Sequence, residues 1–254
     1  MKSVVVALGM SMLIVAPLSN ARAQAPDRGV THNEHQVIST DAFLAAHPDL
    51  KFMLEGSRQL AEKDYKRAAW SFDRAGYYGD KMSQAALAEL YWDGRGVPRD
   101  RPKAYAIADM AAQRLNNVYL LALRERYWEQ LSESEQRTAL EISGPIVERF
   151  SDEYTTPRLK RAMRSGQQTG RPKGSGSMLS SIIAYNIDGT SVEIRPDVFY
   201  AEKFWDVAQY NDFKDELVTK SLRNGKVTVK FGGKSESSDT QSDATDVQNE
   251  RKDD

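Results

Sequence analysis

One stretch of the chain, residues 85–111, most narrowly limits what the protein can fold into. It reads AALAELYWDGRGVPRDRPKAYAIADMA, with small and apolar residues at helical spacing on both sides of a glycine-rich corner. Gly94 and Gly96 supply positions without a Cβ where the chain reverses, and Asp100 is placed to cap the next helix. The stretch therefore predicts a helix, a tight corner and a second helix, and such a hairpin needs neighbours to bury its apolar faces.

The corner contains further structural residues. Val97 lies between Gly96 and Pro98, and we expect it to plug the corner against the helices, because an apolar residue would otherwise be exposed in a loop. The predicted corner residues are Gly94, Gly96, Val97, Pro98 and Asp100.

The neighbouring hairpins are visible as an internal repeat of 36 residues. Ala86, Leu87, Glu89, Tyr91 and Trp92 recur as Ala122, Leu123, Glu125, Tyr127 and Trp128, and Ala68 and Ala75 recur as Ala104 and Ala111. A fixed period of this length is typical of stacked helix pairs. The sequence predicts a mainly α protein: a short α-α solenoid of about three helix pairs over residues 41–153, followed by a small α+β C-terminal module and a disordered tail.

The string A-x-L-A-x-L-Y-x-x-G-x-G-V-P-x-D-x-x-K-A, from Ala85 to Ala104, resembles a Sel1-like repeat, a relative of the tetratricopeptide repeat with a longer corner. The preceding segment is similar to a tetratricopeptide unit, with Phe52, Gly56, Ala68, Phe72 and Ala75 at the expected places. In the third pair, residues 131–135 replace the glycine corner, which suggests a degenerate capping unit. The resemblance covers roughly residues 48–150 and implies a protein-interaction scaffold.

The third pair carries two local signals of its own. Ser132 and Glu135 have the spacing of a capping box for its second helix, which we expect over residues 133–150. The Gly144-Pro145 step should bend or split that helix.

Residues 1–23 have the pattern of a secretory signal peptide. Lys2 precedes an apolar run over residues 4–18, and Ala21-Arg22-Ala23 provides an A-x-A cleavage signal. The alternative is an uncleaved anchor, which the glycine, serine and proline inside the run disfavour. The chain has no cysteine, which excludes disulfides, a thiolate nucleophile and a zinc–thiolate site, and departs from the cysteine-rich exported Sel1 proteins. We expect a periplasmic or secreted protein.

Residues 24–40 are polar and predict a flexible N-terminal arm. His32 and His35 could share a metal ion, but no third ligand is near in the sequence, so a solvated arm is favoured. We therefore predict no metal and no cofactor. The formal net charge of −1 gives no overall basic character, and no nucleic-acid partner is expected.

Residues 154–177 change in charge. They hold six basic residues and no acidic one, and end in a Gly/Ser-rich run: Arg158, Lys160, Arg161, Arg164, Arg171 and Lys173. The pattern favours a terminal basic helix that leads into a flexible linker. The alternative is contact with an anionic surface such as lipid headgroups, wall polymers or nucleic acid.

Residues 178–232 predict a small module with a β-hairpin. Residues 179–185 and 190–195 are predicted strands on either side of a turn at 186–189. Residues 226–231 suggest a third strand. The dense aromatic residues of 198–213 are expected to form its core, although a sugar-stacking platform is the alternative. Residues 233–254 are acidic and lack aromatic residues, so we expect a disordered tail.

We find none of the short catalytic motifs that predict an enzyme, such as G-x-S-x-G, H-E-x-x-H or a phosphate-binding glycine loop. We predict no catalytic residues. The candidates for partner binding are Glu89, Trp92, Glu125 and Trp128, because equivalent positions on the first helices of successive pairs form stripes on the concave face. Tryptophan beside carboxylate suits a peptide with apolar and basic residues. The alternative is that both tryptophans pack between repeats.

Two functions follow from these observations. The first is a non-enzymatic scaffold or adaptor of the bacterial cell envelope, which binds a partner protein or peptide on the concave face of the solenoid. The second is an envelope-associated protein that contacts cell-wall glycan or lipid through the basic linker and the aromatic C-terminal module. An enzyme would instead require a closed pocket with paired titratable groups.

Overall fold

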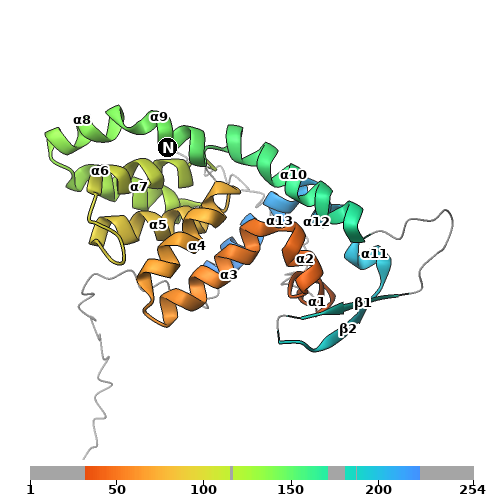
Figure 1. The fold of residues 1–254 in the computed structure, drawn as a ribbon. Coiled ribbons are helices and arrows are strands. Elements are labelled where there is room, and N and C mark those ends of the chain that lie inside the picture. The colour runs from red at the N-terminus through yellow and green to blue at the C-terminus, as the bar shows by residue number, and fades with distance from the viewer. Residues whose placement is uncertain (1–31, 115–116, 171–180, 187, 224–254) are drawn as a thin grey trace, which may run out of the picture.

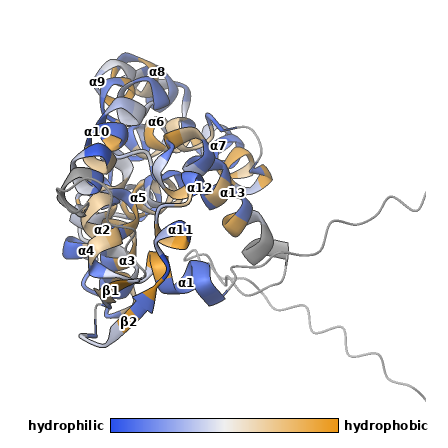
Figure 2. Cartoon of the chain, turned by 90° about the vertical axis from the view of Figure 1, so that its right-hand side faces the viewer, coloured by the Kyte–Doolittle hydropathy of each residue, from blue (hydrophilic) through white to orange (hydrophobic). Residues whose placement is uncertain are grey.

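The structure is a computed structural model that describes residues 32–114, 117–170, 181–186 and 188–223. Within these ranges the chain is almost entirely helical, and its strands are limited to β1 (Ile182–Tyr185) and β2 (Ser191–Ile194). The helices α8 and α9 lie at one end of the molecule, and the β-hairpin with α1 and α2 lies at the other (Figure 1). Figure 2 shows the same order from the side, with hydrophobic and hydrophilic colours mixed along most helices.

Helix pairs form the centre of the chain. They are α3 (Pro48–Ala61) with α4 (Tyr65–Tyr77), α5 (Lys81–Asp93) with α6 (Arg101–Ala111), and α7 (Val118–Gln130) followed by α8 (Glu133–Glu141) and α9 (Ser143–Phe150). Leu87 and Leu123, which are one repeat apart, are each 2% exposed and lie in the same hydrophobic core. The predicted solenoid of about three helix pairs is confirmed.

The third pair departs from a regular hairpin. The helices α8 and α9 pack mainly against α6, and α9 also reaches α4 and α10 (Asp152–Gly170). The helix break falls at Ile142, two residues before Gly144, so the predicted split is confirmed. The capping box is also present: the Ser132 hydroxyl accepts from the Glu135 N–H, and the Glu135 carboxylate accepts from the Ser132 N–H. A pair that folds back in this way closes the array at that end.

The predicted corner forms between α5 and α6. Gly94 and Gly96 have φ values of +71° and +72°, a left-handed region that favours glycine. Asp100 accepts a hydrogen bond from the Lys103 N–H at 3.0 Å, which caps the start of α6. Val97 is half-buried and packs on the main core, while Pro98 is exposed. Gly94, Gly96, Val97 and Asp100 therefore have the structural roles that the sequence predicts.

A second core lies beside the solenoid and joins both ends of the described chain. It is built from α1 (His32–Ile38), α2 (Asp41–Ala46), α10, the β-hairpin, α11 (Pro196–Phe199), α12 (Glu202–Trp205) and α13 (Val207–Arg223). The strands pair antiparallel, with Ile182 opposite Ile194 and Tyr185 opposite Ser191. The predicted hairpin and the predicted burial of the aromatic residues of 198–213 are both confirmed, since Phe199, Phe204 and Tyr210 are at most 4% exposed.

One segment prediction differs from the structure. Residues 32–38 of the expected flexible arm form α1, and its Val37 is fully buried in the second core. The basic helix expected at the start of residues 154–177 is present, since α10 continues to Gly170 with Leu159 and Met163 buried. Apolar residues at helical spacing let α10 pack on α2, which holds the segment against the body of the protein. The segments predicted to form the signal peptide, the flexible linker after residue 170, the third strand and the disordered tail lie outside the described residues.

His47 connects the two parts of the second core. It is fully buried, with Nδ1 2.8 Å from the Phe43 carbonyl oxygen and Nε2 2.7 Å from the Phe204 carbonyl oxygen. Its ring stacks on Phe43 at 3.7 Å between centroids. Burial lowers the pKa of His47, although the nearby Asp49 and both carbonyl contacts act in the opposite direction.

Candidate interaction surfaces

Trp92 lies between successive repeats. Its indole stacks on the Tyr127 ring of α7, with centroids 4.0 Å apart and planes 7° apart. The Arg101 guanidinium lies 4.1 Å from the Trp92 ring centroid and donates a hydrogen bond to the Gln130 carbonyl oxygen at 2.8 Å. The Trp92 side chain therefore joins the ends of α5 and α7. For Trp92, the structure agrees with the alternative given in the sequence analysis, in which the tryptophans pack between repeats.

The Glu89 side chain also lies mainly between successive repeats. It is 9% exposed and lies 3.7 Å from the Arg95 guanidinium. Burial, followed by the charge of Glu89, raises the pKa of both Tyr119 and Tyr127 on α7. Glu89 therefore contributes to the contact between α5 and α7 and presents little of its carboxylate to a partner.

Trp128 and Glu125 lie on a more open surface formed by α6 and α7. The Trp128 and Tyr105 ring centroids are 4.8 Å apart. Arg124 lies between two carboxylates, 2.5 Å from Glu125 and 3.7 Å from Asp109. Burial raises the pKa of Asp109, with a further contribution from Glu125, while Arg124 opposes the shift.

We call the set Tyr105, Asp109, Glu125 and Trp128 the acidic–aromatic surface. The structure brings two of the four predicted residues onto this surface and places the other two, Glu89 and Trp92, between repeats. Sequence reasoning missed Tyr105 and Asp109, because the predicted stripe used only the first helix of each pair. Their i, i+4 spacing on the second helix, opposite its alanine face, was the available signal.

A polar hollow lies beside the corner. It has a volume of about 420 Å³ and is lined by Arg99, Asp100, Arg101, Pro102 and Glu135. Arg101 lies 3.9 Å from the Glu135 carboxylate, so the corner of the second pair and the start of α8 face one another across it. The hollow is open to solvent and contains charges of both signs.

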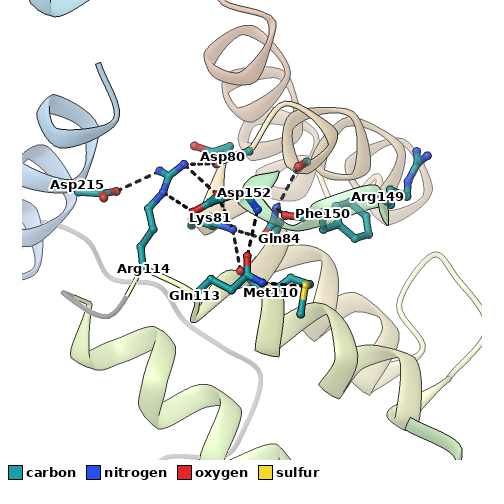
Figure 3. A network of polar contacts seen from close by, with 12 residues as sticks. Asp80, Lys81, Gln84, Met110, Gln113, Arg114, Arg149, Phe150, Asp152 and Asp215 are labelled. Carbon is teal, nitrogen blue, oxygen red and sulfur yellow. Dashed lines mark hydrogen bonds and ion pairs between the residues drawn. The ribbon is translucent and has the colours of Figure 1, made fainter. Parts of the chain in front are cut away.

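A buried ionic cluster occupies the opposite ends of the helices (Figure 3). Lys81, which is 4% exposed, donates to the Met110 carbonyl oxygen at 2.8 Å and lies 3.0 Å from the Asp152 carboxylate. Burial lowers the pKa of Lys81 to about 8, against the opposing charge of Asp152. Arg114 lies 3.2 Å from Asp152 and 3.8 Å from Asp215. The cluster therefore joins α5, α10 and α13 through charged groups.

Lys214 of α13 forms the other half of this contact. Its amino group lies 2.5 Å from Asp49 and 3.5 Å from Asp80. Burial alone would lower the pKa of Lys214, but the two carboxylates outweigh it, and the pKa is raised. A cavity of about 30 Å³ remains between α13 and the starts of α5 and α7, which is room for about one water molecule.

Within the described ranges, no group of three or more His, Cys, Asp or Glu side chains is placed to hold a metal ion. His32 lies 3.0 Å from the Gln36 side chain, one helical turn away. No helix in the part of the chain that the structure describes has both the length and the apolar character needed to cross a membrane.

No protein-family profile matches the chain, and no curated protein sequence matches it. Among solved structures, the chain is similar to c5321, a protective antigen present in uropathogenic Escherichia coli strains that displays an SLR fold. The sequence identity is 22% and the TM-score is 0.39. The match covers 51% of this chain and 27% of the antigen, so this chain spans a small part of that protein.

The geometry of the chain is that of a short solenoid of helix pairs. The pairs pack in succession, and a corner with two left-handed glycines joins α5 to α6. This fold positions the acidic–aromatic surface, the polar hollow and the ionic cluster.

Proposed function

We propose that the chain is a non-enzymatic scaffold or adaptor of the bacterial cell envelope that holds a partner protein or peptide. The observation that carries the proposal is the acidic–aromatic surface, where Tyr105 and Trp128 lie beside Asp109 and Glu125. Aromatic side chains supply contact area at low entropic cost, and carboxylates select a cationic partner. The helical-repeat fold supports an interaction role because its surfaces are extended and open.

The charge balance of this surface supports a cationic partner. Two carboxylates share one guanidinium, that of Arg124, so the surface has an excess of negative charge. The raised pKa of Asp109 supports this, since burial and Glu125 both disfavour its charged form. A lysine or arginine from a partner would relieve that cost, and a neighbouring apolar side chain would cover Trp128. The partner is a segment with a basic residue next to an apolar one.

Glu89 and Trp92 have a supporting role in this proposal. Trp92 stacks on Tyr127, which follows Glu125 on α7 and precedes Trp128. Glu89 lies against the same helix. Together these contacts hold α7 in the position that presents Glu125 and Trp128 to solvent.

A selection from a peptide library tests the proposal. Sixteen-residue peptides displayed on phage would be selected on the full-length chain and then measured against Glu125→Lys and Trp128→Ala. We expect selected peptides to combine basic and apolar residues and to lose at least tenfold in affinity for both variants, which corresponds to about 1.4 kcal/mol.

Two variants serve as matched controls for that selection. Glu141→Lys makes the same charge change at the end of α8, and Trp70→Ala removes a tryptophan that is 57% exposed on α4. Both should bind the selected peptides as the unaltered chain does. Peptides that bind Glu125→Lys and Trp128→Ala without loss, or that depend on Trp70, would show that the acidic–aromatic surface is not the binding site.

Export is the second part of the proposal, and the sequence of residues 1–23 supports it. Fractionation of cells that express a C-terminally tagged chain should place it outside the cytoplasm. N-terminal sequencing should find Gln24 as the first residue. A cytoplasmic chain that retains Met1 would contradict it.

A contact with anionic lipid or wall polymer is the second candidate function. It is favoured by one observation: Lys160, Arg161 and Arg164 are all exposed on α10. The aromatic residues of 198–213, which the sequence analysis proposed as part of the same contact, are largely buried. The exposed basic residues of α10 would therefore make the contact. Sedimentation with phosphatidylglycerol vesicles and with purified wall material tests it, and reversal of the three charges should abolish co-sedimentation.

A further inference from the structure

The helix α13 has two halves with different environments. Its first half belongs to the second core, where Val207 is 7% exposed and Tyr210 is fully buried. In its second half Leu217, Val218 and Thr219 are only half-buried. Both hydrophobic and hydrophilic colours appear on this helix in Figure 2. The second half is therefore less firmly held by apolar burial than the first half.

Charged groups at the middle of α13, where its second half begins, hold the helix against the helix pairs. Lys214 contacts Asp49 in the first turn of α3 and Asp80, the residue that caps α5. Asp215, also on α13, faces Arg114, which follows α6, as Figure 3 shows. The anchors are therefore electrostatic, and they lie at the starts of the first helices of two successive pairs.

Apolar packing under this half is incomplete. Met82 of α5, Leu120 of α7 and Val218 of α13 line the cavity of about 30 Å³. A contact held by charges, with unfilled space beneath its apolar residue, gains less from burial than a close-packed helix does. The surface under α13 is therefore a groove that its present occupant fills only in part.

We propose that this groove, formed by the starts of α3, α5 and α7, is a binding site for an amphipathic helix, and that the second half of α13 is its built-in occupant. The partner helix has a lysine in the place of Lys214 and a bulkier apolar residue four positions later, in the place of Val218. It binds by displacing α13. This site is separate from the acidic–aromatic surface and does not depend on it.

The buried carboxylate of Asp49 gives the site its selectivity. Its side chain is 0% exposed, so removal of Lys214 leaves a desolvated negative charge that must find another cation. A helix with a neutral or acidic residue at that position could not replace α13. The tethered helix competes at a high effective concentration, so a partner in solution binds well only when α13 is released.

The test uses the full-length chain and a fluorescein-labelled peptide of residues 212–223, DFKDELVTKSLR, which omits Val207 and Tyr210 of the second core. The peptide should bind the unaltered chain weakly, because the chain's own α13 competes. Lys214→Glu in the chain places a third carboxylate beside Asp49 and Asp80 and releases α13. We expect fluorescence anisotropy to show at least tenfold tighter binding to this variant.

Two comparisons make the result specific. A peptide with the same Lys→Glu change should fail to bind the Lys214→Glu chain. The Lys160→Glu chain, with an equal charge change on the exposed face of α10, should bind the peptide as weakly as the unaltered chain does. Tight binding of the altered peptide, or equal binding to all chains, would overturn the proposal.

A second variant covers the case in which Lys214→Glu fails to fold, as judged by circular dichroism. Val218→Asp places a carboxylate over Met82 and Leu120 and leaves the lysine anchors intact. It should release α13 and raise peptide affinity in the same way. A folded Val218→Asp chain that binds the peptide no better than the unaltered chain would also overturn the proposal. Library peptides selected on the acidic–aromatic surface should bind both chains equally, so that the two sites are tested separately.

Discussion

Substitution of Gly96 by alanine tests how closely the repeats pack. Gly96 has φ = +72°, and a Cβ at this position would lie 2.3 Å from the Tyr65 carbonyl carbon and 2.5 Å from the Lys66 nitrogen. These are backbone atoms at the start of α4, which cannot move aside as a flexible side chain can. The corner of the second pair therefore touches the backbone of the first pair.

The expected cost has two parts. An alanine in the left-handed region costs about 1 kcal/mol. Overpacking against a neighbouring backbone adds about 1–3 kcal/mol. Gly189 provides a matched control for the first part alone, since its φ is +81° and no atom lies within 4 Å of its Cβ position. We expect Gly96→Ala to lower the free energy of unfolding by about 2–4 kcal/mol and Gly189→Ala by about 1 kcal/mol.

Urea unfolding followed by circular dichroism at 222 nm measures both variants. For a protein of this size, a difference of about 1–3 kcal/mol corresponds to a Tm difference of several degrees. The deciding quantity is the difference in the free energy of unfolding between Gly96→Ala and Gly189→Ala. The cost of placing an alanine at positive φ is common to both variants and cancels. Equal losses at Gly96 and Gly189 would mean that the corner does not touch α4, and the stacking of the first two pairs would be wrong.

Three other predictions concern single residues. Trp92→Ala should lower the free energy of unfolding by about 2–3 kcal/mol in the same urea assay, because it removes the stack of Trp92 on Tyr127. An unchanged free energy of unfolding would mean that Trp92 does not hold the repeats together and is available for partner binding. Gly144→Ala should raise the free energy of unfolding by about 0.5–1 kcal/mol, since its Cβ position is open and the residue is helical. Burial lowers the pKa of His47, so the unfolded chain takes up a proton first as the pH falls below about 6.5. Unfolding titrations from pH 7.5 to 5.5 should show stability falling toward acid, with a smaller slope in His47→Gln. A rise toward acid would mean that the folded ring is a cation held between the Phe43 and Phe204 carbonyl groups.

The repeat unit could be predicted because its signals are local. The glycine corner, the Asp100 cap and the capping box each involve residues within a few positions of one another, and the 36-residue period relates Leu87 to Leu123. Interactions of this kind are set by backbone geometry and by helical spacing. They hold in the structure wherever it describes them.

The second core could not be predicted in the same way. Phe43 contacts Phe199, Phe204 and Trp205, which follow it by more than 150 residues, and no period or motif relates them. The arm that contains Val37 reads as polar because Val37 is the one residue of α1 that is buried. One buried residue per turn is enough to fix a short helix on a core that other segments have built. Pairing between distant segments has no signature in a single sequence.

The same difficulty applies to the candidate surface. Trp92 and Trp128 are equivalent in the repeat, yet one stacks on Tyr127 and the other meets Tyr105. The difference arises because Trp92 is followed by another first helix, α7, whereas the array ends after Trp128. Equivalent positions share a direction but have different neighbours at an end of the solenoid.

The two ends of the described helix array are covered by different means. At one end α8 and α9 fold back over α6. At the other, α10 crosses α2 so closely that a Cβ on Gly166 would lie 2.1 Å from the Ala46 Cβ. Because these elements cover the ends, the two sites that we propose both lie along the sides of the array: the acidic–aromatic surface on α6 and α7, and the groove that α13 fills.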